Sequence, residues 1–167
     1  METNNLSEKR MLGFRAVCLP NGHVISDDRA RIDMDFVHSS IASSYWAVGR
    51  PRELTERSWA NSMCLGLYGP DGKQIGFARV LTDYALRAHI ADVFLHPEAR
   101  GLGLGKALVE TILAHPALMT VSRWTLTTAD AQDLYRKYGF QPAKADDTWM
   151  TMERTGQAGA ITPYAPE

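Results

Sequence analysis

A glycine-rich segment constrains this chain more than any other stretch. A nearly continuous apolar run, 88–95, leads into it, and the apolar stripe of an amphipathic run, 107–113, leaves it. Between them three glycines stand at alternate positions, flanked by two basic residues: Arg100, Gly101, Gly103, Gly105 and Lys106. This order reads as a strand, a tight turn and a helix start. Backbone N–H groups and the positive end of a helix dipole converge at such a turn, which predicts a phosphate-binding site.

Three other interpretations of the turn are weaker. A Walker A loop needs a glycine where Arg100 stands and a Ser or Thr where Ala107 stands. A dinucleotide fingerprint needs G-x-G-x-x-G and an acidic residue about 20 positions later, and residues 120–123 hold no carboxylate. A turn that only tolerates glycine is the third, but each glycine that enters a helix start weakens it by roughly 1 kcal/mol. A close approach of the backbone to a ligand explains the glycines better.

The periodicity of the remaining chain predicts strands and helices that form one mixed sheet. Strands are expected within 24–32, 62–68, 74–82, 88–95, 122–128 and 148–153, and helices over 36–43, 52–62 and 107–113, with a short helix capped by Asp130 and closed by Gly139. The turn Pro70-Asp71-Gly72 predicts an antiparallel hairpin. The strand–helix–strand unit over 88–128 implies a right-handed crossover and a parallel pair. The expected fold class is therefore α/β, as an α+β mixed sheet.

Within the hairpin, alternation places Ile75, Phe77 and Leu81 on one face of the second strand. Arg79 falls on the same face. Asp92 interrupts the following strand, and a buried carboxylate needs a partner. A structural pair between Arg79 and Asp92 is one expectation for these two residues.

Length and composition bound the function. With 167 residues and a net charge of −1, the chain predicts one domain and no global field for nucleic acid or a membrane surface. We expect an N-terminal arm or short strand in 1–23, a domain over 24–154 and a flexible tail in 155–167. The polar start predicts no signal peptide, and the unclustered Cys18 and Cys64 indicate reduced thiols in the cytoplasm.

Two motifs together resemble one family. Arg100-x-x-Gly103-x-Gly105, between a strand and a helix, resembles the acyl-CoA-binding motif (Q/R-x-x-G-x-G/A) of the GNAT acetyltransferase superfamily. Downstream, the segment from Tyr135 to Phe140 resembles that family's Tyr-x-Lys-x-Gly-Phe motif. The resemblance covers about residues 88–140. It implies a GNAT-like fold, a central and mostly antiparallel sheet with one parallel, splayed pair, flanked by helices.

The resemblance also implies acetyl-CoA as the co-substrate, with no metal. The turn's amides would hold the pyrophosphate of coenzyme A, and the strand's main chain would pair with the pantetheine arm. The residues so implied are Val93, Phe94, Leu95, Gly101, Leu102, Gly103, Leu104, Gly105 and Lys106, while Arg100 and Lys106 either add charge or are simply solvated. Thr128 stands where relatives often carry an asparagine that touches the cofactor, and a hydroxyl offers similar hydrogen bonds.

For catalysis, the resemblance matches Tyr135 to the tyrosine that protonates the departing thiolate, against the alternative of a core aromatic residue. The base is open between His89, Asp92 and a water chain. His89 lies where some relatives place a glutamate base, and its intrinsic pKa suits the task, but an exposed histidine at the start of a strand is the plainer interpretation. Asp92 is a base, an amine-binding group or the partner of Arg79.

The expected reaction is direct attack of a primary amine on the thioester, with strand amides supporting the oxyanion. Tyr45, Trp46 and Arg79 are predicted to bind substrate. In relatives the acceptor site is covered by the segment that here holds Tyr45, Trp46, Arg50 and Trp59. The alternative for the aromatic residues is packing of the helices on the sheet, which suits Trp59 better than Trp46. The acceptor is a small-molecule amine or a protein amine, with no nucleic acid or membrane partner, and the protein is a monomer or homodimer. The alternatives are a non-catalytic coenzyme A-binding or sensor module of the same fold, and a different acyl group or an oxygen acceptor.

Overall fold

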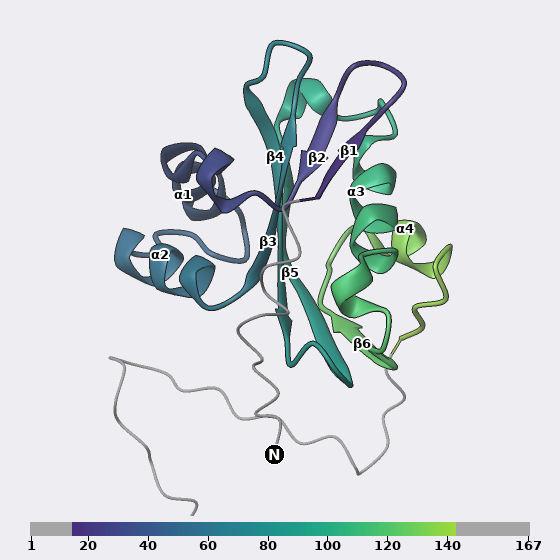
Figure 1. The fold of residues 1–167 in the computed structure, drawn as a ribbon. Helices are drawn as coiled ribbons and strands as arrows, with labels where there is room; N and C mark the ends of the chain where they lie inside the picture. The colour runs from purple at the N-terminus through teal and green to yellow at the C-terminus, as the bar shows by residue number, and fades with distance from the viewer. Residues whose placement is uncertain (1–14, 143–167) are drawn as a thin grey trace, which may run out of the picture.

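In the part of the chain that the structure describes, six strands form one sheet whose spatial order follows the sequence order (Figure 1). The computed structural model describes residues 15–142, and the strand expected at 148–153 lies outside them. The strands are β1 (Ala16–Cys18), β2 (Val24–Ser26), β3 (Met63–Tyr68), β4 (Gln74–Thr82), β5 (Arg87–Leu95) and β6 (Arg123–Leu126). Neighbouring strands are antiparallel except β5 and β6, which are parallel. The prediction of a mixed α/β sheet with one parallel pair is confirmed.

Helices cover both faces of this sheet. The helices α1 (Met34–Ala42) and α2 (Arg52–Ala60) lie on one face, and α3 (Leu104–Leu113) and α4 (Gln132–Arg136) lie on the other (Figure 1). Short 3-10 turns are η2 (Arg29–Arg31), η3 (Pro97–Ala99) and η4 (Pro116–Leu118). Helix α1 begins near the predicted place because the Asp33 carboxylate accepts hydrogen bonds from the backbone N–H groups of Asp35 and Phe36, both at 3.0 Å.

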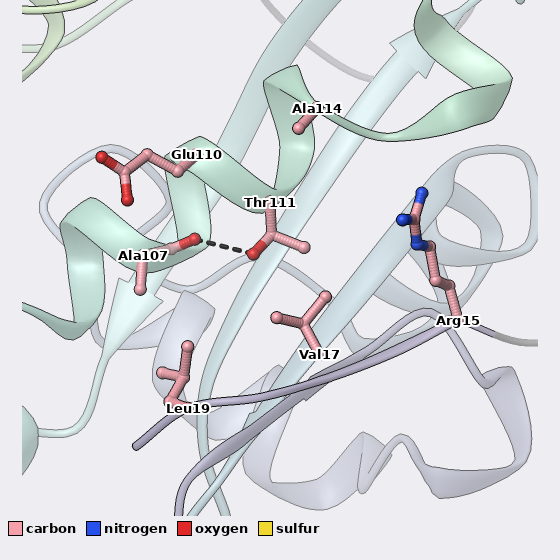
Figure 2. A pocket seen from close by; sticks show the side chains of 7 residues that line it. All are labelled: Arg15, Val17, Leu19, Ala107, Glu110, Thr111 and Ala114. Carbon is pink, nitrogen blue, oxygen red and sulfur yellow. Dashed lines mark hydrogen bonds between the residues drawn. The ribbon is translucent and has the colours of Figure 1, made fainter. Parts of the chain in front are cut away.

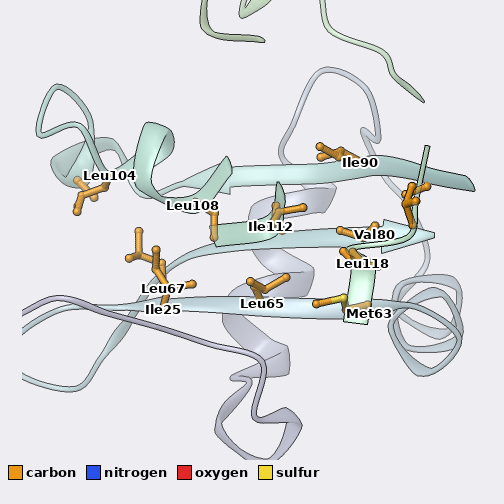
Figure 3. Close-up of a cluster of buried hydrophobic side chains, with 14 residues drawn as sticks. Ile25, Met63, Leu65, Leu67, Val80, Ile90, Leu104, Leu108, Ile112 and Leu118 are labelled. Carbon is orange, nitrogen blue, oxygen red and sulfur yellow. The ribbon is translucent and has the colours of Figure 1, made fainter. Parts of the chain in front are cut away.

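The main core lies between the sheet and α3. Leu104, Leu108 and Ile112 present the predicted stripe of that helix and are almost fully buried. They pack with side chains from four strands and from η4, including Ile25, Leu65, Leu67, Val80, Ile90 and Leu118 (Figure 3). A smaller cluster, Val37, Ile41, Ala47, Cys64 and Phe77, lies under α1 and α2. Each face of the sheet is therefore sealed by its own helices.

The hairpin face predicted for Ile75 was wrong. Leu67 pairs with Gly76 and Tyr68 pairs with Gln74, so Ile75 is the extra residue of a β-bulge. A bulge changes the alternation of side chains by one position. Ile75 therefore packs against the main core, whereas Phe77 lies in the cluster under α1 and α2.

One other local prediction differs from the structure. Asp130 does not cap α4: the N-cap residue is Ala131, which has no side-chain cap, and the Thr128 hydroxyl accepts from the Ala131 N–H at 3.0 Å. The strand expected within 24–32 is confirmed as β2, and it is only three residues long because the carboxylate of Asp28 caps η2 by accepting from the Ala30 N–H. Gly139 does close the short helix, with a φ of 86°.

The edge strand β1 lies in the segment 1–23, for which the sequence analysis expected either an arm or a short strand. It pairs with β2, and the imidazole of His115, at the end of α3, bonds the carboxylate of Asp27 at 3.0 Å. Among the described residues, no helix has the length and apolar character needed to cross a membrane.

Candidate active site

The glycine turn presents a row of free amides at the N-terminus of α3. Within residues 15–142, none of the six N–H groups from Gly101 to Lys106 donates a hydrogen bond. Gly101 and Gly103 adopt left-handed backbone conformations, with φ of 76° and 75°, which glycine adopts without strain. Gly105 has another role, since a Cβ there would lie 3.3 Å from Leu95, so its small size lets α3 approach β5.

Strands β5 and β6 separate beside this turn. Their pairing runs from Arg87 opposite Arg123 to Ile90 opposite Leu126 and then stops, although β5 continues to Leu95. In the described part of the chain, the edge of 91–95 that faces β6 has no strand partner. The main chain of Val93, Phe94 and Leu95 is thus open to a ligand on that side, next to the amides of the turn.

A bulge in β5 sets the position of Asp92. Phe77 pairs with Phe94 and Arg79 pairs with Ala91, so two residues of β5, Asp92 and Val93, lie opposite one residue of β4. Asp92 has a φ of 48°, a left-handed conformation that aspartate tolerates better than most residues. In a regular strand Asp92 would share the core face of Ile90. The bulge directs its carboxylate to the face of α1 and α2.

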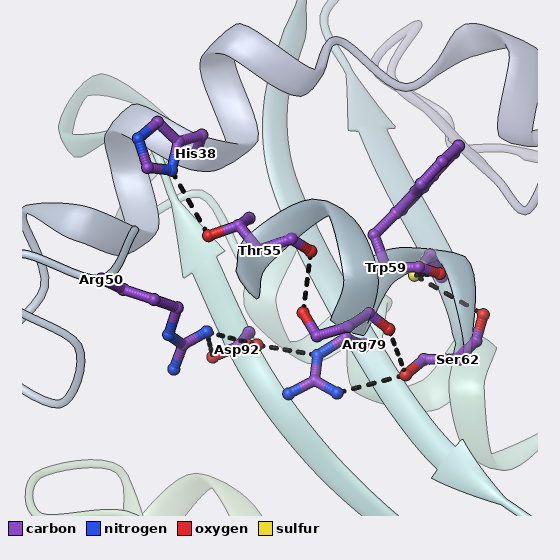
Figure 4. Close-up of polar contacts among 9 residues, drawn as sticks. His38, Arg50, Thr55, Trp59, Ser62, Arg79 and Asp92 are labelled. Carbon is purple, nitrogen blue, oxygen red and sulfur yellow. Dashed lines mark hydrogen bonds and ion pairs between the residues drawn. The ribbon is translucent and has the colours of Figure 1, made fainter. Parts of the chain in front are cut away.

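On that face Asp92 binds two arginines (Figure 4). Its carboxylate accepts from Arg79 Nε at 2.7 Å and, through both oxygens, from Arg50 Nη1 at 3.1 and 3.2 Å. The expected pair of Arg79 and Asp92 is therefore present. Burial by itself raises the pKa of Asp92, but Arg79 and Arg50 outweigh it and hold the pKa below its usual range.

The polar contacts continue from this pair beneath α2. Arg79 Nη1 donates to Ser62 Oγ at 3.1 Å, and Ser62 Oγ donates to the carbonyl of Ser58 at 2.7 Å. The Ser58 hydroxyl in turn donates to the carbonyl of Thr55, whose own hydroxyl bonds His38 Nδ1 at 3.3 Å (Figure 4). This chain fixes α2, and the loop before it, to the centre of the sheet.

His89 lies on the same face, at the point where β5 and β6 begin to separate. Its Nδ1 lies 2.9 Å from the Thr125 hydroxyl, which itself is placed to donate to the Ala88 carbonyl at 3.4 Å. This arrangement favours a proton on Nδ1 and a lone pair on Nε2. Burial, and then the charge of Arg79, lower the pKa of His89, with Asp92 opposing them. The imidazole is therefore neutral near pH 7.

Tyr135 is 6% exposed and its ring packs edge-on against Phe140, with centroids 5.8 Å apart. Among residues 15–142 the Tyr135 hydroxyl has no hydrogen-bond partner. Its oxygen is not among the side-chain atoms that are both fully buried and unpaired, so it is not completely enclosed by protein. Burial, assisted by Asp130, raises the pKa of Tyr135, so the phenol stays protonated. Tyr135 is therefore neither a purely core residue nor a solvent-exposed one.

The remaining predicted site residues lie around these groups. Tyr45 accepts a hydrogen bond from the Ala129 N–H at 3.1 Å, so the loop after α1 touches the loop that carries Thr128. Its ring meets Trp46 edge-on at 4.9 Å. Arg100 Nε donates weakly to the Leu95 carbonyl at 3.4 Å, and Lys106 lies 3.7 Å from Glu110. In the part of the chain that the structure describes, no three His, Cys, Asp or Glu side chains gather as a metal site.

A separate groove of about 260 Å³ lies between β1 and the flank of α3 (Figure 2). None of the predicted site residues lines it. Its walls are Arg15, Val17, Leu19, Ala107, Glu110, Thr111 and Ala114. The groove therefore contributes no support to the site beside β5.

Sequence reasoning missed the contact of Arg50 with Asp92. Arg50 lies 42 residues before its partner, in a loop without periodicity. The signal available was a lone carboxylate in an apolar strand, which shows that a partner is needed but does not say where it lies in the sequence. The bulge at Asp92 had no signal either, because no glycine marks it.

Comparison with known proteins agrees with this geometry. A family model described as an acetyltransferase (GNAT) domain matches residues 62–142. The crystal structure of a GNAT-family protein from Xanthomonas campestris pv. campestris is 38% identical, and the alignment covers 79% of this chain and 93% of that one with a TM-score of 0.75. This chain belongs to the GNAT family of acetyltransferases.

Curated relatives match over a shorter segment. The uncharacterized N-acetyltransferase ycf52 of Pyropia yezoensis is 37% identical over 71 residues, which is 42% of this chain and 41% of that protein. The chloroplastic GCN5-related N-acetyltransferase 2 of Arabidopsis thaliana is 42% identical over 71 residues, 41% of this chain and 27% of that protein. The chain thus matches less than half the length of either relative.

Proposed function

We propose that this protein transfers an acetyl group from acetyl-CoA to a primary amine by direct attack of the amine. The observation that carries the proposal is the row of six amides that, within residues 15–142, have no acceptor and lie beside the edge of β5 that has no strand partner there. A diphosphate bound to the N-terminus of a helix needs no side-chain cation. An extended amide arm fits a strand edge that has no strand partner.

Acetyl-CoA supplies an activated thioester to this site. The amides of residues 101–106 would hold its pyrophosphate, and Val93, Phe94 and Leu95 would bind its amide arm along the strand edge. Thr128 follows β6, the strand that separates from β5 at this site. Its hydroxyl oxygen accepts from the Ala131 N–H, and its hydrogen remains available to a ligand. Arg100 and Lys106 add positive charge at the turn.

Tyr135 acts as the general acid. The phenol keeps its proton at neutral pH because burial raises its pKa, and its hydroxyl has no competing partner in the described part of the chain. A group in this state can donate the proton to the departing sulfur. Packing against Phe140 restricts the ring and so supports a defined direction for that donation.

His89 acts as the general base. Its lowered pKa leaves a lone pair on Nε2 near pH 7, which can accept the proton that an alkylammonium must lose before its nitrogen attacks. Asp92 is a poorer base because two guanidinium groups hold its carboxylate in the ionised form. We assign Asp92 the task of positioning Arg50 and Arg79.

The test combines ligand binding with turnover. Millimolar acetyl-CoA should raise the thermal midpoint of unfolding, since a ligand that binds only the native state stabilises it. Release of free coenzyme A thiol, followed over a panel of amines, should reveal turnover. Tyr135→Phe should lower kcat by about 10²- to 10⁴-fold and leave acetyl-CoA binding unchanged.

Tyr138→Phe is the matched control, because its hydroxyl donates to Glu110 and to the Lys106 carbonyl on the surface of α3 and is not the proposed acid. Equal turnover by Tyr135→Phe and the wild type would reject the acid role. Absence of a thermal shift with acetyl-CoA would reject the co-substrate.

The free thiols of Cys18 and Cys64 are consistent with the cytoplasm as the location we propose.

A further inference from the structure

The ion-pair cluster under α2 has a surplus of one positive charge. It joins one carboxylate, Asp92, to two guanidinium groups, Arg79 and Arg50. Asp92 has only 3% of its side chain exposed, and the two arginines have 12% and 23%. A surplus charge that is partly removed from water is costly unless an anion compensates it.

The two arginines differ in how many donors they have left. Arg79 uses Nε on Asp92 and Nη1 on Ser62, and it is the more buried of the two. Arg50 uses only Nη1, and among residues 15–142 its Nε and Nη2 bond nothing. Figure 4 shows Arg50 reaching Asp92 from the loop before α2, with part of its guanidinium turned away from the carboxylate.

Arg50, which carries the surplus positive charge, lies near the expected position of the acceptor. The loop between α1 and α2 also carries Tyr45 and Trp46, large aromatics that are 58% and 42% exposed. Asp92, to which Arg50 is tied, lies in the stretch of β5 that has no partner on the β6 side. Arg50 is thus fixed beside the strand edge along which the acetyl group would lie.

Among residues 15–142, the neighbouring carboxylates other than Asp92 pair with other arginines. On α2, Glu53 pairs with Arg57 and Glu56 pairs with Arg52, on the solvent side of that helix. Asp35 of α1 also pairs with Arg52. Within residues 15–142, the ion pairs of Asp92 are those with Arg79 and Arg50.

We propose that Arg50 binds an anionic group of the acceptor, so that the substrate is an amine bearing a carboxylate or a phosphate close to its nitrogen. A guanidinium presents a planar fork of donors that suits either group. Asp92 and Arg79 hold the fork in place, which makes Arg50 the residue that determines acceptor charge. This inference rests on the acetyltransferase function proposed above.

The experiment compares matched amines that differ only in the anion. One arm sets common amino acids against their carboxamides, and the other sets phosphoethanolamine against ethanolamine, with thiol release as the readout. The wild type should use the anionic member of a pair with a KM at least about tenfold lower. The arm that shows this preference identifies the anion.

Arg50→Gln should raise the KM for the anionic member by about 10- to 100-fold and leave the neutral member unchanged. Asp92 keeps Arg79 in this variant, so the fold should persist, and its thermal midpoint checks this. Arg57→Gln is the matched control, an exposed arginine of α2 paired with Glu53, and it should change neither KM.

The outcomes separate the two proposals. An equal loss for both members of a pair in Arg50→Gln would assign Arg50 a structural role and overturn the inference. If acetyl-CoA stabilises the protein but no anionic amine is used better than its neutral partner, the inference fails while acetyl-CoA binding stands. If acetyl-CoA neither stabilises the protein nor is consumed, the proposed function itself fails.

Discussion

The two faces of the sheet differ in the polarity of their buried side chains. Between the sheet and α3 the buried side chains form one apolar cluster around Leu65, Leu108 and Ile112. Under α1 and α2 the apolar cluster is smaller, and it borders buried polar residues that include Ser40, Thr55, Ser62 and Asp92. Apolar packing stabilises without direction, whereas hydrogen-bonded charges fix positions at a cost in desolvation. One face therefore serves stability, and the other holds side chains in defined places.

The largest effect should be on turnover and should come from the polar face. His89→Gln removes the proposed base, and kcat should fall about 10²- to 10⁴-fold, or about 3–5 kcal/mol in the activation barrier. The thermal midpoint should stay near that of the wild type because His89 is only half-buried. Steady-state kinetics and a thermal melt check both statements.

The pH profile sharpens this prediction. Burial, and then Arg79, lower the pKa of His89, so the kcat/KM of the wild type should fall only below the usual histidine range. His89→Gln should lose that acid limb. Turnover by the variant within threefold of the wild type would contradict the base role.

The apolar face should give the largest effect on stability. Leu108 of α3 is fully buried against the sheet, and Leu108→Ala should lower the free energy of unfolding by about 2–5 kcal/mol through lost burial and a residual cavity. At a temperature where the variant is folded, kcat should not change. Denaturant unfolding measures the loss, and Met119→Ala, at a residue 70% exposed, is the control. A similar loss in both variants would contradict the proposed division between the faces.

Asp92→Asn should affect stability less. The substitution leaves two partly buried guanidinium groups without a carboxylate, and the free energy of unfolding should fall by about 1–3 kcal/mol at pH 7. The folded pKa of Asp92 lies below its unfolded value. Its contribution is therefore complete above the unfolded value, near 4, and is lost as the pH falls through the folded value.

Denaturant unfolding from pH 7 downward checks the sign, and the wild type and Asp92→Asn should converge in acid. Asp133→Asn, which alters an exposed pair with Arg136, should show no measurable loss at pH 7. A difference between wild type and Asp92→Asn that grows toward low pH would show that the ionised carboxylate is not stabilising.

The smallest effect should come from the contact between the two loops. Tyr45→Phe removes the hydrogen bond to the Ala129 N–H, which contributes about 0.5–1.5 kcal/mol in general and less at an exposed residue. The loop that carries Thr128 loses an anchor, so the KM for acetyl-CoA should rise two- to threefold with kcat unchanged. An unchanged KM would limit this contact to packing.

The sequence predicted the apolar face better than the polar one. Helix α3 and the strands β3 to β5 follow from periodicity, and the parallel pair follows from the strand–helix–strand order. These features depend on a pattern that many residues repeat, so that no single residue decides them. The two motifs placed the glycine turn and Tyr135 for the same reason, since each has several residues in register.

What the sequence missed depends on single residues. The bulge at Ile75 and the bulge that turns Asp92 each shift the alternation by one position. Gly76 stands beside the first, but no glycine marks the second. The turn before α4 is held by the Thr128 hydroxyl and not by Asp130, a choice between two side chains that both accept hydrogen bonds. Arg50 meets Asp92 only through the tertiary fold.

The free amides of the glycine turn have a consequence for how such a protein tolerates mutation. A donor that belongs to the main chain is not deleted when a codon changes, provided the backbone keeps its path. Replacing Leu102 or Leu104 leaves six N–H groups in place, whereas replacing Gly101 or Gly103 alters the path itself. The acceptor contacts proposed for Arg50 and Trp46, in contrast, depend on side chains in a separate loop. Acceptor preference is therefore free to drift, or to be evolved in the laboratory, without loss of the turn.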